Sequence, residues 1–135
     1  MDQTPETNSP FKGKTGLTRI INAAGYSKDG FIAAFEEQGF RQLFYLSCVL
    51  IPIALLLGFA PIHKLLMVLA SLATLTIELF NTAIEAAVDH TSLERHPLAK
   101  RAKDTGSAAQ IMGLTCLAII WLFALFTDKP WMSWF

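Results

Sequence analysis

The chain has 135 residues, of which 53% are hydrophobic and 16% are charged, and its formal net charge at pH 7 is zero. Soluble globular domains carry about 25% charged residues, so the shortage of charge and the long apolar runs indicate a membrane protein. A balanced charge gives no overall field that would attract nucleic acid, and we expect no nucleic-acid partner.

Residues 1–15 are rich in threonine, proline, asparagine, glycine and lysine, which predicts a disordered tail. A single membrane-embedded domain is expected over residues 16–135. Its first element is a predicted amphipathic surface helix, residues 16–40, with an interruption at residues 26–30 next to Gly25. The apolar positions recur as one helix face requires: Leu17, Ile20, Ile21 and Ala24. This polar, short segment suits the membrane interface, and a small soluble helical hairpin is the alternative.

Three apolar segments follow, each long enough to cross a membrane, at residues 43–60, 65–88 and 105–127. We expect a short turn between the first two segments and a polar loop at residues 89–104 between the last two. Tryptophans after the third segment are typical of the membrane–water interface. The predicted class is therefore an all-α integral membrane protein, with three transmembrane helices and an N-terminal amphipathic surface helix.

Lysine and arginine are distributed unevenly along this pattern. Nine of the 11 lie before the first span or in the 89–104 loop, and two lie on the other side of the membrane. Because positive residues accumulate on the cytoplasmic side, the N-terminus and the 89–104 loop are expected in the cytoplasm.

The second span ends in an acidic stripe. At 100° per residue, Glu78, Asn81, Glu85 and Asp89 fall within a wedge of about 80° on one helix face. An ionisable side chain at the centre of a membrane helix costs about 2.5–3.5 kcal/mol on insertion scales. A whole acidic stripe on one face therefore indicates a functional site.

Carboxylates that hold magnesium, beside basic groups that hold phosphates, are the working parts of phosphoryl transfer. Glu37 supplies another carboxylate near the cytoplasmic boundary, and the 89–104 loop supplies the basic groups. Two other interpretations stay open at this point. The acidic groups could pair with Arg19, Arg41 or Lys103 across a helix bundle, or a membrane glutamate could carry protons in a small transporter.

Four segments resemble the bacterial integral-membrane diacylglycerol kinase family. They are TGLTRIINAAGYS at 15–27, ExxFRQ at 37–42, ExxNTAIEAxVD at 78–89 and ExHPLAKRAKDxGSAA at 94–109. The resemblance implies a homotrimeric bundle with shared active sites in the bacterial inner (cytoplasmic) membrane. It also implies transfer of the γ-phosphoryl group of ATP, with Mg²⁺ as cofactor, to a membrane lipid alcohol. Undecaprenol kinases share this fold and most of the acidic motif, so they are the alternative within this class.

The resemblance also implies residue roles. Glu78 matches the general base, with Asn81 positioning that site, and Glu37 and Glu85 match the magnesium ligands. Nucleotide contacts are implied for eight residues: Arg19, Tyr26, Glu37, Glu85, Glu94, His96, Lys103 and Asp104. Lipid contacts are implied for four: Arg19, Ser27, Glu78 and Ser107. The chain departs from the family pattern at Lys28, Leu43 and Arg95, and its segment between Phe35 and Phe40 is one residue shorter. The metal role is assigned to Glu37 by its spacing from Phe40 and Arg41, and Glu36 is the alternative.

Overall fold

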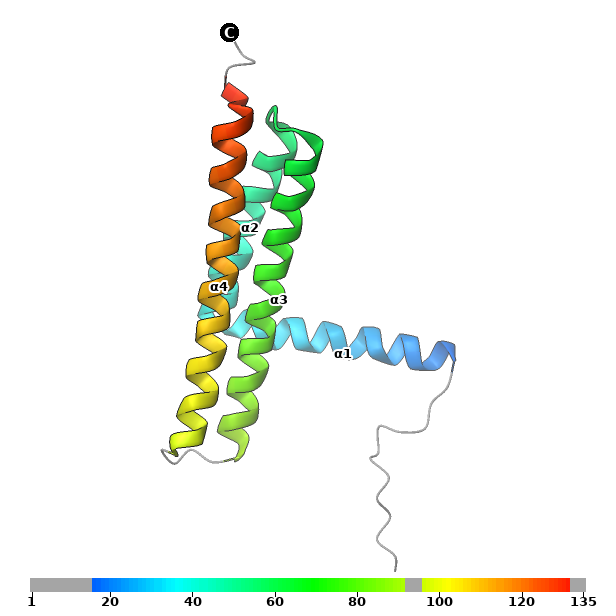
Figure 1. The fold of residues 1–135 in the computed structure, drawn as a ribbon. Coiled ribbons are helices and arrows are strands. Elements are labelled where there is room, and N and C mark those ends of the chain that lie inside the picture. The colour runs from blue at the N-terminus through cyan, green and yellow to red at the C-terminus, as the bar shows by residue number, and fades with distance from the viewer. Residues whose placement is uncertain (1–15, 92–95, 132–135) are drawn as a thin grey trace, which may run out of the picture. The chain divides into compact units, whose positions relative to one another are not determined.

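A computed structural model of the chain describes residues 16–91 and 96–131. The helices in these ranges are α1 (Leu17–Glu36), α2 (Gln38–Leu56), α3 (Pro61–Thr91) and α4 (Pro97–Asp128), and the described ranges contain no strand (Figure 1). The chain divides into two compact units, Met1–Ala33 and Ala34–Phe135. The predicted all-α class is thereby confirmed.

The first unit contains most of α1, which runs without a break through Gly25 and Gly30. The interruption predicted at residues 26–30 is therefore wrong. Neither glycine has a positive φ, and a glycine inside a helix weakens it by about 1 kcal/mol relative to alanine without ending it. Several large apolar side chains on α1 are exposed, as an interfacial helix requires: Ile20, Ile21, Phe31 and Ile32.

The second unit begins at the corner between α1 and α2. Glu37 is the extended residue between the two helices, with φ −81° and ψ 133°, and its side chain makes no capping hydrogen bond. Arg41 Nη1 instead holds the corner, donating to the carbonyl oxygens of Phe35 and Glu36 at 2.8 Å each. The Glu37 carboxylate is thus not used in building the corner.

Figure 1 shows α2, α3 and α4 side by side, with α3 antiparallel to both of the others. Each is long and apolar enough to cross a membrane, which confirms the three expected membrane helices. At most 22% of the most apolar window of each helix is buried within the chain. Lipid or another protein surface must therefore cover the remaining apolar faces.

The turn between α2 and α3 closes one end of this bundle. α2 ends at Leu56, and Pro61 opens α3, where its missing N–H costs no helical hydrogen bond. A buried cluster joins the turn to the end of α4, and its members are Ala54, Phe59, Met67 and Ala124. This cluster ties the end of α4 to the α2–α3 turn, which lies far from it in sequence, and so closes one end of the bundle.

The polar stretch 89–104, predicted as a loop, is largely helical. α3 continues to Thr91 and α4 starts at Pro97, so helices cover both ends of this stretch. His96 caps α4 by accepting a hydrogen bond from the Leu98 N–H at 3.2 Å, and Pro97 takes the first helical position. Good capping therefore starts α4 well before its apolar part.

Candidate active site

Glu78 is a buried carboxylate on α3, with 8% of its surface exposed. Gly39, in the first turn of α2, lies so close that a Cβ atom there would overlap Glu78 Oε1. No hydrogen bond or ion pair of Glu78 occurs among the described residues. Because a buried charge is costly unless it is paired, the Glu78 carboxylate is a candidate for binding a ligand.

Two further carboxylates gather around Glu78. Glu85, two turns along α3, and Glu37, at the start of α2, both lie near enough to repel its negative charge. Acidic residues from two separate segments of the sequence therefore act on one carboxylate, although the three do not lie together as a metal-binding group in the described ranges. Like charges held close together are stabilised by a cation, which makes this cluster electrostatically suited to one.

The charge-pairing interpretation accounts for Asp89 alone among the acidic residues of the stripe. Lys103 Nζ lies 2.7 Å from Asp89 Oδ1 and links α4 to the end of α3. Arg41 is bonded to backbone carbonyls at the α1–α2 corner. Neither of these two predicted cations forms an ion pair with Glu78 or Glu85 in the described part of the chain, although Glu85 lies near enough to attract Lys103.

Asn81 lies on the same stripe, where α3 and α4 approach closely. A Cβ atom at Gly106 of α4 would overlap Asn81 Oδ1 and would lie 3.9 Å from Asn81 Cα. Asn81 Oδ1 is buried and has no hydrogen-bond partner among the described residues. An unpaired buried amide oxygen beside the carboxylates is available to bind a donor.

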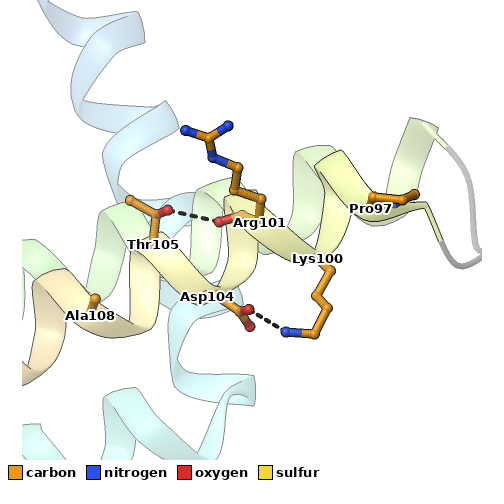
Figure 2. A pocket seen from close by; sticks show the side chains of 6 residues that line it. All are labelled: Pro97, Lys100, Arg101, Asp104, Thr105 and Ala108. Atoms are coloured by element: carbon orange, nitrogen blue, oxygen red, sulfur yellow. Dashed lines mark hydrogen bonds and ion pairs between the residues drawn. The ribbon is translucent and has the colours of Figure 1, made fainter.

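The first turns of α4 carry the basic groups. Figure 2 shows an open hollow along this helix, lined by Pro97, Lys100, Arg101, Asp104, Thr105 and Ala108. Within it Lys100 pairs with Asp104, and Thr105 Oγ1 donates to the Arg101 carbonyl at 2.8 Å. The Arg101 guanidinium projects away from this pair (Figure 2). Cationic groups therefore cluster at the same end of the bundle as Asp89.

The remaining predicted residues divide by their place in the chain. His96 and Ser107 are exposed residues at the start of α4, Lys103 is half-buried and Asp104 is exposed. Arg19, Tyr26 and Ser27 belong to the α1 unit, where Ser27 Oγ donates to the Ala23 carbonyl at 2.9 Å. Glu94 lies outside the described residues. The roles of all these residues stay predictions.

A model of the prokaryotic diacylglycerol kinase family matches residues 25–125. The chain belongs to this family. It is similar to a protein named diacylglycerol kinase from Pseudomonas aeruginosa, with 57% identity over 114 residues, 84% of this chain and 93% of the relative. A diacylglycerol kinase of Haemophilus influenzae is 42% identical over 113 residues, 83% and 96% of the two chains. A diacylglycerol kinase of Escherichia coli K12 is 40% identical over 114 residues, 84% and 93% of the two chains.

Membership confirms the resemblance stated from the sequence, and the family implies a divalent metal beside ATP. In the described ranges, no three His, Cys, Asp or Glu side chains lie together as a complete metal site. Magnesium, however, keeps several waters and binds through one or two carboxylates plus substrate phosphates. The mutually repelling carboxylates near Glu78 therefore fit a magnesium ion that arrives with a nucleotide.

Sequence reasoning missed two features of the helix bundle. Gly39 was overlooked, although a glycine between Glu37 and Phe40 is a local signal for close helix approach. Gln110 on α4 was also overlooked, and both of its amide side-chain atoms are buried without a partner among the described residues. The signal for Gln110 is a single amide inside an otherwise apolar span.

Proposed function

We propose that this protein is a membrane-embedded, ATP-dependent diacylglycerol kinase that transfers the γ-phosphoryl group to the primary hydroxyl of diacylglycerol and forms phosphatidic acid. The observation that carries the proposal is the unpaired Glu78 carboxylate, buried against Gly39 and flanked by Glu37 and Glu85. A carboxylate in this setting suits a general base, and the two flanking carboxylates suit a metal–phosphate complex.

In the proposed reaction, Glu78 takes the proton of the lipid hydroxyl as the hydroxyl oxygen forms a bond to the γ-phosphorus. The bond from the γ-phosphorus to the β–γ bridging oxygen breaks, and ADP leaves. Asn81 positions the hydroxyl beside the base. Catalysis of this type depends mainly on positioning and charge stabilisation, which a rigid helix pair supplies.

Glu37 and Glu85 would hold magnesium on the nucleotide phosphates, where the ion would neutralise negative charge on the transferring group. The cationic start of α4 would hold the nucleotide, through Lys103, His96 and Asp104 together with Glu94. Arg19, Tyr26, Ser27 and Ser107 are proposed for the phosphate and lipid contacts on the strength of the family motifs.

The proposal places this site at the cytoplasmic face of the bacterial inner membrane, because the lysines and arginines favour that side. α3 continues 13 residues beyond Glu78 to Thr91, which raises Glu78 toward head-group level if the last turns project from the bilayer. A homotrimer with shared active sites is proposed from the family motifs, and it would cover part of the exposed apolar faces of α2–α4.

The experiment that tests this function is phosphoryl transfer from labelled MgATP in mixed micelles. Diacylglycerol and undecaprenol are offered separately to the wild type and to Glu78→Gln. Transfer to diacylglycerol that collapses in the variant supports both the reaction and the base. Preference for undecaprenol would assign the same site to the polyprenol reaction, and no transfer to either lipid by folded protein would refute the kinase proposal.

A further inference from the structure

Gln110 lies in the apolar part of α4 and has no role in the reaction described so far. Both its side-chain atoms that can hydrogen-bond, Nε2 and Oε1, are buried and have no partner among the described residues. A methionine of similar length would fill the same space without an unpaired amide, which is costly in an apolar setting. The amide therefore needs an explanation beyond packing.

Two contacts fix the level of Gln110 along the helix pair. Gly106 packs on Asn81, and a Cβ atom at Gly113 would lie 3.9 Å from Thr74 Cα. Gln110 comes four residues after Gly106 and three before Gly113. Glu78 comes three residues before Asn81 and four after Thr74. Because α3 and α4 are antiparallel, these two contacts place Gln110 and Glu78 within one residue of the same height, or about 1.5 Å along the helix axis.

The Lys103–Asp89 ion pair shows which side of the α3–α4 pair Gln110 and Glu78 face. Gln110 lies seven residues after Lys103 on α4, about 20° short of two full helical turns, so both face the same side of α4. Glu78 lies eleven residues before Asp89 on α3, about 20° more than three full turns, so both face the same side of α3. Since Lys103 Nζ reaches Asp89 Oδ1 at 2.7 Å, these two stripes face the same side. Gln110 therefore shares both its level and its side with Glu78.

We infer that Gln110 is a positioning residue of the phosphoryl-transfer site. Its Nε2, which has no partner among the described residues, turns to donate to the Glu78 carboxylate when substrate binds and orients that carboxylate toward the lipid hydroxyl. This inference rests on the proposed function of Glu78. Asn81 Oδ1, a second amide atom without a partner among the described residues, lies less than one turn from Glu78 on α3. Both helices therefore carry an available amide near the level of this carboxylate, and such groups can orient a carboxylate held for catalysis.

The test compares Gln110→Met with Leu117→Met in the full-length protein. Leu117 lies two turns further along the same stripe of α4 and is 6% exposed, so it controls for a changed buried side chain. For each variant, kcat, the KM values for MgATP and diacylglycerol, and the thermal unfolding temperature are measured. Gln110→Met is expected to lower kcat about tenfold or more, because a misplaced base reacts slowly.

The accompanying readouts separate positioning from structural support. Gln110→Met should leave the KM for MgATP unchanged and leave the unfolding temperature equal or higher, since it removes an unpaired buried amide. Leu117→Met should keep kcat within about twofold, as size-conserving core changes usually do. In the Glu78→Gln background, Gln110→Met should cause no further loss, because its effect acts through the Glu78 carboxylate.

Three results would overturn the inference. One is an unchanged kcat in Gln110→Met, and another is a lowered unfolding temperature with a matching loss of activity, which would make Gln110 a structural residue. The third is an additive loss in the double variant. Failure of the proposed function is distinguishable, because it appears as no transfer by the wild type or as full activity in Glu78→Gln, and either result overturns both claims.

Discussion

At the α2–α3 turn, Asp128 Oδ2 accepts a hydrogen bond from the Ala60 N–H at 2.8 Å and lies 2.7 Å from His63 Nδ1. Where α2 begins, near the middle of α3, Glu78 and the Asn81 oxygen have no such partner among the described residues. Polar groups therefore tie α4 to the α2–α3 turn, and Lys103 and Asp89 tie it to the end of α3, whereas Glu78 and Asn81 between them are left available.

The end of the bundle at the α2–α3 turn, called the closed end here, is also the better packed. Phe59 meets Trp121 edge-to-face, with ring centroids 6.0 Å apart, beside the cluster around Met67. Trp121 Nε1 is an unpaired exception there. At the level of Glu78 and Asn81, called the open end here, glycines let side-chain oxygens approach neighbouring helices, as Gly39 and Gly106 do. Stability and reactivity are thus expected to respond to mutations at different levels of the bundle.

The largest expected effect is that of Glu78→Gln at the open end. Losing the general base should lower transfer by about 10²–10⁴-fold. The same change removes a buried charge that Glu37 and Glu85 repel, so the unfolding temperature should rise or stay unchanged. Measuring kcat and thermal unfolding on the same preparation checks both. A marked loss of stability would contradict the view of Glu78 as a carboxylate kept for the reaction.

A pair of neighbouring variants tests the metal role at the α1–α2 corner. Glu37→Gln should lower activity about 100-fold and raise the magnesium concentration needed for half-maximal rate, because a metal ligand is lost. Glu36→Gln is the matched control, since Glu36 is exposed and does not repel Glu78. Titration of both variants with magnesium measures the difference. Equal effects would remove the metal assignment from Glu37.

Two glycine-to-alanine variants test whether the position of the Glu78 carboxylate matters for the rate. Gly39→Ala places a methyl group against Glu78 Oε1, whereas a Cβ atom at Gly30 meets nothing within 4 Å. The Glu78 carboxylate can move aside, so Gly39→Ala should cost about tenfold in kcat with little loss of stability. Gly30→Ala should leave kcat unchanged and strengthen α1 by about 0.5–1 kcal/mol. Full activity in Gly39→Ala would show that the position of the Glu78 carboxylate is not critical.

The smallest effect on activity is expected at the closed end. Asp128→Asn weakens the link between α4 and the α2–α3 turn, so the unfolding temperature should fall. The kcat of the folded protein should not change, because Glu78 lies 15 residues, or about 22 Å, along α3 from His63. His63→Gln should lower the unfolding temperature too, and the double variant should be less than additive, since both residues act through one contact. A lowered kcat without a change in the unfolding temperature would contradict the expectation that the closed end affects stability and not the rate.

Much of the fold could be predicted because it depends on local patterns. Apolar runs of membrane-spanning length gave α2, α3 and α4, and the 3.6-residue period placed Glu78 and Glu85 on one face. Local patterns predict wrongly where helix-favouring and helix-weakening residues occur together. The glycines predict a break in α1 that does not occur. The polar composition of residues 89–104 predicts a loop, but capping by His96 and Pro97 extends α4 into that stretch.

The class of protein, the membrane helices and the acidic stripe follow from residue period, length and composition, because these patterns act over a few helical turns. The packed helices were needed to show that the Glu37 charge acts on Glu78, that Gly39 and Gly106 leave room for the Glu78 and Asn81 oxygens, and that Gln110 lies near the level of Glu78. The same holds for the Ala60–Asp128 contact, which spans 68 residues. These facts depend on the register and facing sides of packed helices, which side-chain packing sets and no local pattern encodes.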